Sequence, residues 1–332
     1  MPELDMTQTA RLPNPDALSR EAAPAAAFFV PLAVLGLLLP SYSLLAVNQH
    51  LLLAVNVLAL NFCLGLGGQA SLAQGAFCGM GAYLSTLTVS AWPEGAAILL
   101  PIIVAVVFVT GALISYPMEA LGEGFLAMAT LGISLIFTNV VHSLPELTGG
   151  GEGMVLHEPI ALPIIGALQG DRLHYFLLLA LLAVGVYLYV CMRGSRLGRA
   201  LMACREDSLA AAACGVSRPR VRAMAFGLGA ALSAVAGALY AHYAGFISPN
   251  QFDLHLSLKA LLFLVIGGPG RLYPPLLAVL LLETALSEAQ ILGEARTLAH
   301  GLLLAAALLF DPERRLPGLE SLVPRTLRRR IS

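Results

Sequence analysis

Long runs of uncharged apolar residues dominate the chain, and charges, prolines and glycines interrupt them. These interruptions leave about ten apolar segments, at residues 26–46, 50–66, 69–90, 96–116, 122–143, 173–192, 223–246, 256–270, 275–292 and 297–310. A helix needs about 20 apolar residues to cross the hydrocarbon of a bilayer. The pattern therefore predicts an all-α, polytopic membrane protein with about ten transmembrane helices, of which the last three are short.

The composition supports this class. Of the 332 residues, 58% are hydrophobic and only 12% are charged, whereas soluble domains carry roughly 25% charged residues. We expect a polar N-terminal tail over residues 1–25, a transmembrane domain over 26–310 and a basic tail over 311–332. The first 21 residues lack the positive start and short apolar core of a cleaved signal peptide.

Arginine distribution predicts the orientation of the loops. Residues 193–222 contain seven arginines and two acids, and residues 311–332 contain six arginines and three acids. Residues 144–172 instead contain four acids and one arginine. Since cytoplasmic loops carry an excess of positive charge, we expect 193–222 and 311–332 inside and 144–172 outside. Threading ten spans through these constraints places both termini in the cytoplasm.

The stretch "GLGGQASLAQGAFCGMGAY", residues 65–83, places six glycines within an uncharged region. Gly75 and Gly79 form a small-xxx-small pattern, which is typical of close helix packing. The denser glycines at 65–69 predict a tight turn between spans or unwound backbone lining a water-filled path, and both can be true at one end of a pathway. In the second case the hydrogen-bonding side chains on offer are those of Asn61, Gln69, Ser71 and Gln74. Segments 50–66 and 69–90 are either two separate spans or one broken helix plus a second span. We expect Gly67, Gly68 and Gln69 to tolerate substitution poorly.

A second glycine-interrupted run, "VIGGPGRLYPP" at residues 265–275, resembles the first. It contains Gly267 and Gly268 between two apolar segments. Interrupted segments at corresponding positions in the two halves of a membrane protein often mark a transport site. The alternative is that two such short glycine clusters resemble each other by chance.

The arginine-rich loop 193–222 predicts two short helices. Leu197, Leu201 and Cys204 share one face of the first. Asp207 or Ser208 is placed to cap the second, "LAAAACG", and Gly215 to end it. Pro219 is expected to prevent early re-entry into helix. An alanine-rich helix has little apolar surface of its own, so it suits docking into a groove of another protein; an ordinary inside loop is the alternative.

Several chemistries have no support in the sequence. Lys259 is the only lysine and is not in a Gly-Lys-Ser/Thr context, so the chain has no nucleotide-binding P-loop. The five cysteines form no CxxC pair, and the seven histidines have no metal-ligand spacing. We find no hydrolase motif and expect no catalytic residues, metal site, cofactor or nucleic-acid binding.

Several of these stretches together resemble a known family. Five stretches of the chain are similar to permeases of ATP-binding-cassette importers for branched-chain amino acids. They are the loop "SRLGRALMACREDSLAAAACGV" and the stretches "NFCLGLGGQASLAQGAFCGMGAY", "FLAMATLGISLIFTNVVHSLPELTGGGEGM", "GALYAHYAGFISPNQF" and "LLFLVIGGPGRLYPPLLAVLL". The similarity covers about residues 55 to 312 and is greatest to the second, M-type permease subunit. The general Glu-Ala-Ala motif of importer permeases is only partly met, because Leu209 replaces its glutamate before Ala210 and Ala211.

The resemblance implies a fold, partners and a location. The chain would have the importer permease fold in the bacterial inner membrane and would pair with a second, homologous permease. Two cytoplasmic ATPases would drive the pair, and a periplasmic binding protein would deliver substrate.

The resemblance also implies two groups of site residues. The substrate path would include Asn61, Gly67, Gly68, Gln69, Ser71, Thr130, Gly267 and Gly268. ATPase coupling through 193–222 would involve Arg199, Glu206, Asp207, Ala210, Ala211 and Gly215.

Two other transport functions stay open at this level. Permeases for urea and short-chain amides share these motifs, so the substrate class is not fixed. An ion-coupled secondary transporter would need buried acids within its spans. Glu283 is the most embedded acid here, although it also suits a helix end or a contact with a partner subunit.

Overall fold

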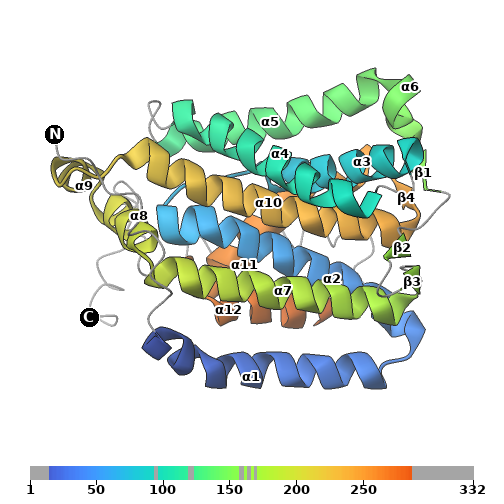
Figure 1. The fold of residues 1–332 in the computed structure, drawn as a ribbon, viewed down its shortest axis with the longest axis horizontal. Helices are drawn as coiled ribbons and strands as arrows, with labels where there is room; N and C mark the ends of the chain where they lie inside the picture. Colours follow the sequence, from blue (N-terminus) through green and yellow to red (C-terminus); the bar gives the residue numbers. More distant parts are fainter. Residues whose placement is uncertain are drawn as a thin grey trace, which may run out of the picture.

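The computed structural model describes residues 15–92, 96–118, 123–156, 161–162, 166–167 and 170–285. The predicted segment 297–310, the basic tail 311–332 and most of the predicted tail 1–25 lie outside these residues. Long helices run side by side through the described part (Figure 1). The expected all-α membrane class is confirmed.

The first half of the chain is helical apart from one interrupted stretch. Its elements are α1 (Pro15–Leu38), α2 (Ser41–Leu60), a π-helix η2 (Asn61–Leu66) that continues α2, α3 (Gln74–Ala91), α4 (Ala96–Met118), α5 (Glu123–Ser143), the short α6 (Pro145–Thr148) and the 3-10 turn η5 (Gly150–Glu152). Between η2 and α3, residues 68–73 are not helical.

The second half combines long helices with short ones at one end. Its helices are α7 (Asp171–Gly194), α8 (Arg196–Glu206), α9 (Ser208–Ala213), α10 (Arg218–Ala244), η6 (Pro249–Phe252), α11 (Leu254–Gly267), α12 (Tyr273–Ala278) and a second π-helix η7 (Val279–Glu283). Strand β1 (Met154–Val155) pairs antiparallel with β4 (Phe246–Ile247), with Met154 opposite Ile247. Strand β2 (Ala161–Leu162) pairs antiparallel with β3 (Gly166–Ala167).

Six helices in the described residues are long and apolar enough to cross a membrane, covering Glu21–Leu38, Tyr42–Leu66, Leu99–Met118, Phe125–Ser143, Asp171–Gly194 and Arg218–Ala244. The expected number of ten is not confirmed. The prediction of one span over 26–46 is wrong, because α1 ends at Leu38 and α2 begins at Ser41. Pro40 precedes α2 with extended backbone, which ends the apolar run as a helix.

Helix α10 lies at the centre of the bundle and packs against α3, α4, α2 and α7 (Figure 1). The crossing with α3 is close: a Cβ added to Gly237 would lie 1.8 Å from the Cys78 carbonyl oxygen. The predicted packing role of Gly75 fits the same picture, because a Cβ there would lie 2.5 Å from the Asp253 carbonyl oxygen. Small residues thus let these helix backbones approach closely.

Candidate functional site

The first glycine cluster ends a helix. The π-helix η2 continues α2, and Gly67 caps it with an ordinary negative φ of −92°. Gly68 has a φ of +71°, a left-handed conformation that favours glycine. With this geometry the Gly68 N–H donates to the Leu64 carbonyl at 3.1 Å, and the Gln69 N–H donates to the Cys63 carbonyl at 3.1 Å. The turn reading of 65–69 therefore describes this end of the stretch.

Residues 69–73, which follow, are unwound backbone inside the bundle. The Leu72 N–H donates to Thr130 Oγ1 on α5 at 3.0 Å, and the Ala73 N–H donates to Ser71 Oγ at 3.3 Å. At the start of α3, the Gly75 N–H donates to Ser257 Oγ on α11 at 2.9 Å. Irregular backbone at membrane depth is tolerated when protein groups satisfy it. The backbone of this stretch is thus unwound, and Ser71 and Thr130 bind it. That it lines a water-filled path stays a prediction.

Two glutamines hold the unwound stretch against its neighbours. Both side chains are fully buried. Gln69 Nε2 donates to Ser115 Oγ on α4 at 3.4 Å, and Gln74 Oε1 accepts a 2.7 Å hydrogen bond from Ser233 on α10. The stretch 69–75 is therefore bonded to α4, α5, α10 and α11.

The two glycine-interrupted runs meet in space. Asn61 Nδ2 donates to the Arg271 carbonyl at 2.7 Å, and Asn61 Oδ1 accepts from the Gly270 N–H at 2.9 Å. Asn61 is 1% exposed, so it clamps the turn after α11 from within the protein. In that turn Gly268 has a φ of +88°, and a Cβ on Gly267 would lie 2.2 Å from the Pro275 nitrogen at the start of α12.

Two arginines that sequence reasoning did not single out attach α8 to this region. Arg205 Nη1 donates to the Gly65 carbonyl. Arg222, in the first turn of α10, is 3% exposed, and its Nη2 donates to the Cys204 carbonyl at 3.1 Å. Arginine in a loop of this charge fits the positive-inside rule, so the sequence offered no signal to separate these two from the rest.

The loop 193–222 forms the two predicted helices. Of the two cap candidates, Asp207 is the one used: its Oδ1 accepts from the Leu209 and Ala210 N–H groups at 2.9 and 3.0 Å. Gly215 has a φ of +82°, and the Gly215 and Val216 N–H groups donate to the Ala212 and Ala211 carbonyls. This pair of bonds is a Schellman ending of α9.

The side chains of α8 and α9 divide into inward and outward sets. Leu201, Cys204 and Ala211 are buried, whereas Arg199, Glu206 and Ala210 are exposed and Leu209 is 77% exposed. Ala211 therefore packs within its own chain. The expectation for Pro219 is wrong: α10 begins at Arg218 with Pro219 in its first turn, where a missing N–H costs no helical hydrogen bond.

An ion pair joins α11 to the second π-helix, η7. Lys259 Nζ lies 3.2 Å from Glu283 Oε1, and the two side chains are 34% and 5% exposed. The pair thus brings together the sole lysine of the sequence and the acid expected to be most embedded.

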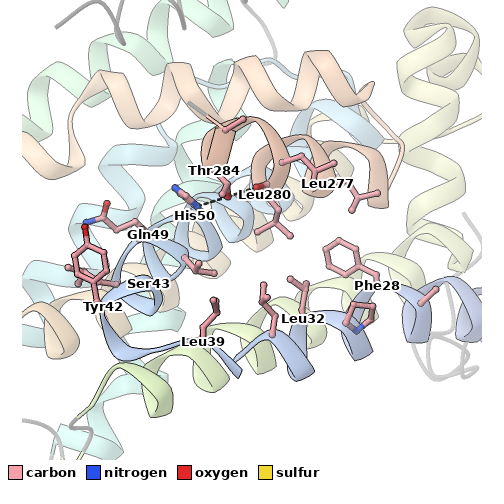
Figure 2. A pocket seen from close by; sticks show the side chains of 18 residues that line it. Phe28, Leu32, Leu39, Tyr42, Ser43, Gln49, His50, Leu277, Leu280 and Thr284 are labelled. Atoms are coloured by element: carbon pink, nitrogen blue, oxygen red, sulfur yellow. Dashed lines mark hydrogen bonds between the residues drawn. The ribbon is translucent and has the colours of Figure 1, made fainter. Parts of the chain in front are cut away.

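A large cavity lies away from the predicted path residues. It has a volume of about 1170 Å³ and is lined by α1, α2 and the α12–η7 region. Figure 2 shows Phe28, Leu32 and Leu39 on one side and Leu277 and Leu280 on the other. His50 Nδ1 and Thr284 Oγ1 lie 3.2 Å apart at its wall. No residue predicted for the path lines this cavity.

The bond from Ser257 to the unwound stretch yields a stability prediction. Ser257→Ala leaves the buried Gly75 N–H without its acceptor, which costs about 1–3 kcal/mol. We expect a melting midpoint several degrees lower in detergent. Thr110→Ala is the control, because Thr110 donates only to Val106 of its own helix on an exposed face. Equal midpoints for the two variants would show that this bond does not hold the stretch.

Comparison with known proteins now identifies the family. A family model described as the permease component of branched-chain amino acid transport systems matches residues 43–310. The high-affinity branched-chain amino acid transport system permease protein LivM of Escherichia coli strain K12 is 31% identical over 285 residues, covering 78% of this chain and 66% of the relative.

Two further relatives match over shorter lengths. LivH of Salmonella typhimurium strain LT2 is 36% identical over 136 residues, covering 40% of this chain and 42% of the relative. BraD of Pseudomonas aeruginosa is 36% identical over 140 residues, covering 41% of this chain and 44% of the relative. The chain spans slightly less than two thirds of the length of LivM, and no solved structure gives a significant match. With its membrane-spanning helices and this match over most of its length, the chain belongs to the family of branched-chain amino acid transport permeases.

Proposed function

We propose that this chain is one of two permease subunits of an ATP-driven importer for branched-chain, hydrophobic amino acids in a bacterial inner membrane. The family match over residues 43–310 is the observation that carries the proposal, because it includes all but the first of the long described helices. The second permease is a homologue of this chain. Two cytoplasmic ATPases supply energy, and a periplasmic binding protein supplies substrate.

The arrangement of the short elements supports an orientation. Helices α8 and α9 lie at one end of the bundle, and the paired strands β1 and β4 lie at the opposite end (Figure 1). The arginine excess assigns residues 193–222 to the cytoplasm. Residues 144–172 then face the periplasm, and both termini are proposed to be cytoplasmic.

The path residues contribute mainly through backbone shape in this proposal. Asn61, Ser71 and Thr130 use their polar atoms to hold backbone groups of the same chain. Together with Gly67, Gly68, Gln69, Gly267 and Gly268 they shape the wall of the path near its cytoplasmic end. Substrate then passes beside a wall of ordered backbone, as expected where unwound segments occur in transporters.

The capped helix α9 is proposed as the contact with an ATPase. Its outward residues Leu209 and Ala210 present a small apolar surface at the cytoplasmic end, while the Asp207 cap and the Gly215 ending fix its limits. Arg199 and Glu206 are exposed on the neighbouring α8 and are assigned to the charged rim of the same contact.

Reconstitution tests the function directly. The chain, its second permease, the ATPases and the binding protein are placed in liposomes, and uptake of labelled leucine is measured with and without ATP. We expect uptake that needs ATP, persists with a proton ionophore, and is inhibited by isoleucine and valine. If urea or acetamide inhibits uptake instead, the chain is a permease for urea or short-chain amides. If uptake stops with the ionophore, the chain is an ion-coupled transporter. The chain alone is expected to hydrolyse no ATP.

Docking of α9 gives a mutational prediction. Ala210→Glu adds a charged side chain to the outward face, so ATPase co-purification is expected to fall at least tenfold with normal membrane insertion. Ala210→Ser is the control at the same site, because it keeps the size small, and it should retain the ATPases. Ala211→Glu is less informative, since Ala211 is buried in its own chain. Full co-purification with Ala210→Glu would exclude α9 as the docking helix.

A further inference from the structure

Three segments distant in sequence meet at one point beside α8. They are the η2 end of α2, the turn after α11 and the last turn of α8. Asn61 of η2 bonds the Gly270 N–H and the Arg271 carbonyl, and the Tyr189 hydroxyl of α7 donates to the Gly270 carbonyl at 3.3 Å. The Asn61 side chain therefore fastens the end of η2 to the turn after α11 through hydrogen bonds to backbone groups, and Tyr189 of α7 holds the same turn.

The Arg205 side chain contacts both runs. Its Nη1 donates to the Gly65 carbonyl. A Cβ added to Gly270 would lie 2.8 Å from Arg205 Nη1, and one added to Gly68 would lie 3.1 Å from Arg205 Cγ. A single side chain of α8 thus lies against the first run at two positions and against the second run at one.

The contact leaves no room for side chains on the glycines. A Cβ on Gly65 would lie 1.8 Å from Asn61 Oδ1 and 2.8 Å from the Gly270 nitrogen. Because Gly65 has no side chain, its carbonyl is accessible to the Arg205 guanidinium. This planar group carries several N–H donors in a fixed geometry. Arg205 is an exposed residue, and its hydrogen bond to the Gly65 carbonyl links α8 to the first run. Movement of α8 therefore shifts this run or breaks the bond.

We propose that Arg205 is the positioning residue that transmits movement of α8 and α9 to the inner ends of both glycine-interrupted runs. The inference rests on the proposed function, in which α9 contacts an ATPase. Arg205 lies three residues before α9, and its guanidinium reaches the two runs that flank the predicted path. ATPase closure then shifts the turn at 67–70 and the turn at 268–271 together.

The test separates transmission from a merely structural role. In the reconstituted complex, Ala70→Cys is placed in a background with Cys191→Ser and Cys214→Ser, because the other native cysteines are buried. The rate of maleimide labelling at position 70 is measured with and without a non-hydrolysable ATP analogue. We expect a labelling change of at least threefold with Arg205 present. Arg205→Ala should abolish this change and lower leucine uptake at least tenfold, while ATPase co-purification and basal hydrolysis persist.

Two further variants complete the design. Arg205→Lys keeps one donor for the Gly65 carbonyl but lacks the guanidinium plane against Gly270, so we expect intermediate labelling and uptake. Arg205 and Arg220 are both exposed, but Arg220, in the first turn of α10, contributes none of the atoms nearest to Gly65, Gly68 or Gly270. Arg220→Ala is therefore the matched control, and it should behave as the parent.

Each result decides the proposal. A nucleotide-dependent change that persists in Arg205→Ala, or that is absent from the parent complex, overturns it. Failure of both Arg205→Ala and Arg205→Lys to assemble assigns Arg205 a structural role and also overturns it. If the parent complex does not transport leucine but shows the labelling change, the proposed substrate fails while the transmission role is still measured.

Discussion

Replacing Gly68 by leucine is expected to abolish substrate uptake while the subunit still reaches the membrane. Gly68 has a φ of +71°, which costs a non-glycine residue roughly 1–2 kcal/mol. The new Cβ would lie 3.1 Å from Arg205 Cγ, and the remaining carbons of leucine would enter the space that Arg205 occupies. The end of η2 and the attachment of α8 are disturbed together, so we expect uptake below a tenth of the parent value.

Two other glycines control for this result. Gly132 on α5 has open space around an added Cβ, so Gly132→Leu should leave uptake within twofold of the parent. Gly67→Ala should also be tolerated, because Gly67 has a negative φ and its Cβ would make an ordinary 3.4 Å contact with Leu201. This differs from the sequence-based expectation that both glycines are intolerant. Normal uptake with Gly68→Leu would remove the turn from the functional core.

Hydrophobic patterning predicted the helices that are bounded by charge. The segments 122–143 and 173–192 correspond closely to α5 and α7. Patterning failed where the apolar run continues through a break, as at Pro40 between α1 and α2. Proline alone does not locate such breaks, because Pro24 and Pro31 lie inside α1.

The hydrogen bonds that begin and end α9 could be predicted from the sequence, whereas hydrogen bonds between residues far apart in the chain could not. The Asp207 cap and the Gly215 ending depend on residues within one turn, so the sequence indicated both. The acceptors for the unwound stretch lie far along the chain: Thr130 is 58 residues from Leu72, and Ser257 is 182 residues from Gly75. The sequence therefore did not decide between a turn and unwound backbone, and the structure contains a turn followed by unwound backbone.

The same difference between local and long-range hydrogen bonds explains why the partners of the predicted path residues could not be predicted. The spacing of Asn61 and Ser71 along the chain indicated polar groups near glycines, but not that these groups bind backbone of their own chain. Likewise, Arg205 is one of seven arginines in the loop 193–222. Only its position against Gly65 and Gly270 distinguishes it from the others.

The ion pair between Lys259 and Glu283 gives the second large expected effect. Lys259→Met leaves the Glu283 carboxylate, which is 5% exposed, without its 3.2 Å partner. Removing one charge of a fully buried pair costs about 3–5 kcal/mol, and the cost here is smaller because the Lys259 side chain is 34% exposed. We therefore expect the yield of folded subunit in detergent to fall severalfold. The double variant Lys259→Met/Glu283→Gln removes both charges, and it should restore most of that yield.

The double variant also separates the two transport mechanisms. An ion-coupled transporter would depend on a titratable acid in its spans, so loss of the Glu283 carboxyl would stop uptake even in well-folded protein. An ATP-driven importer needs no such group, and uptake by the double variant should then stay ATP-dependent and insensitive to a proton ionophore. Restored folding without uptake would contradict a purely structural pair and would favour ion coupling. Restored folding with uptake would leave ATP hydrolysis by the partner subunits as the energy source, with Lys259 and Glu283 joining α11 to η7.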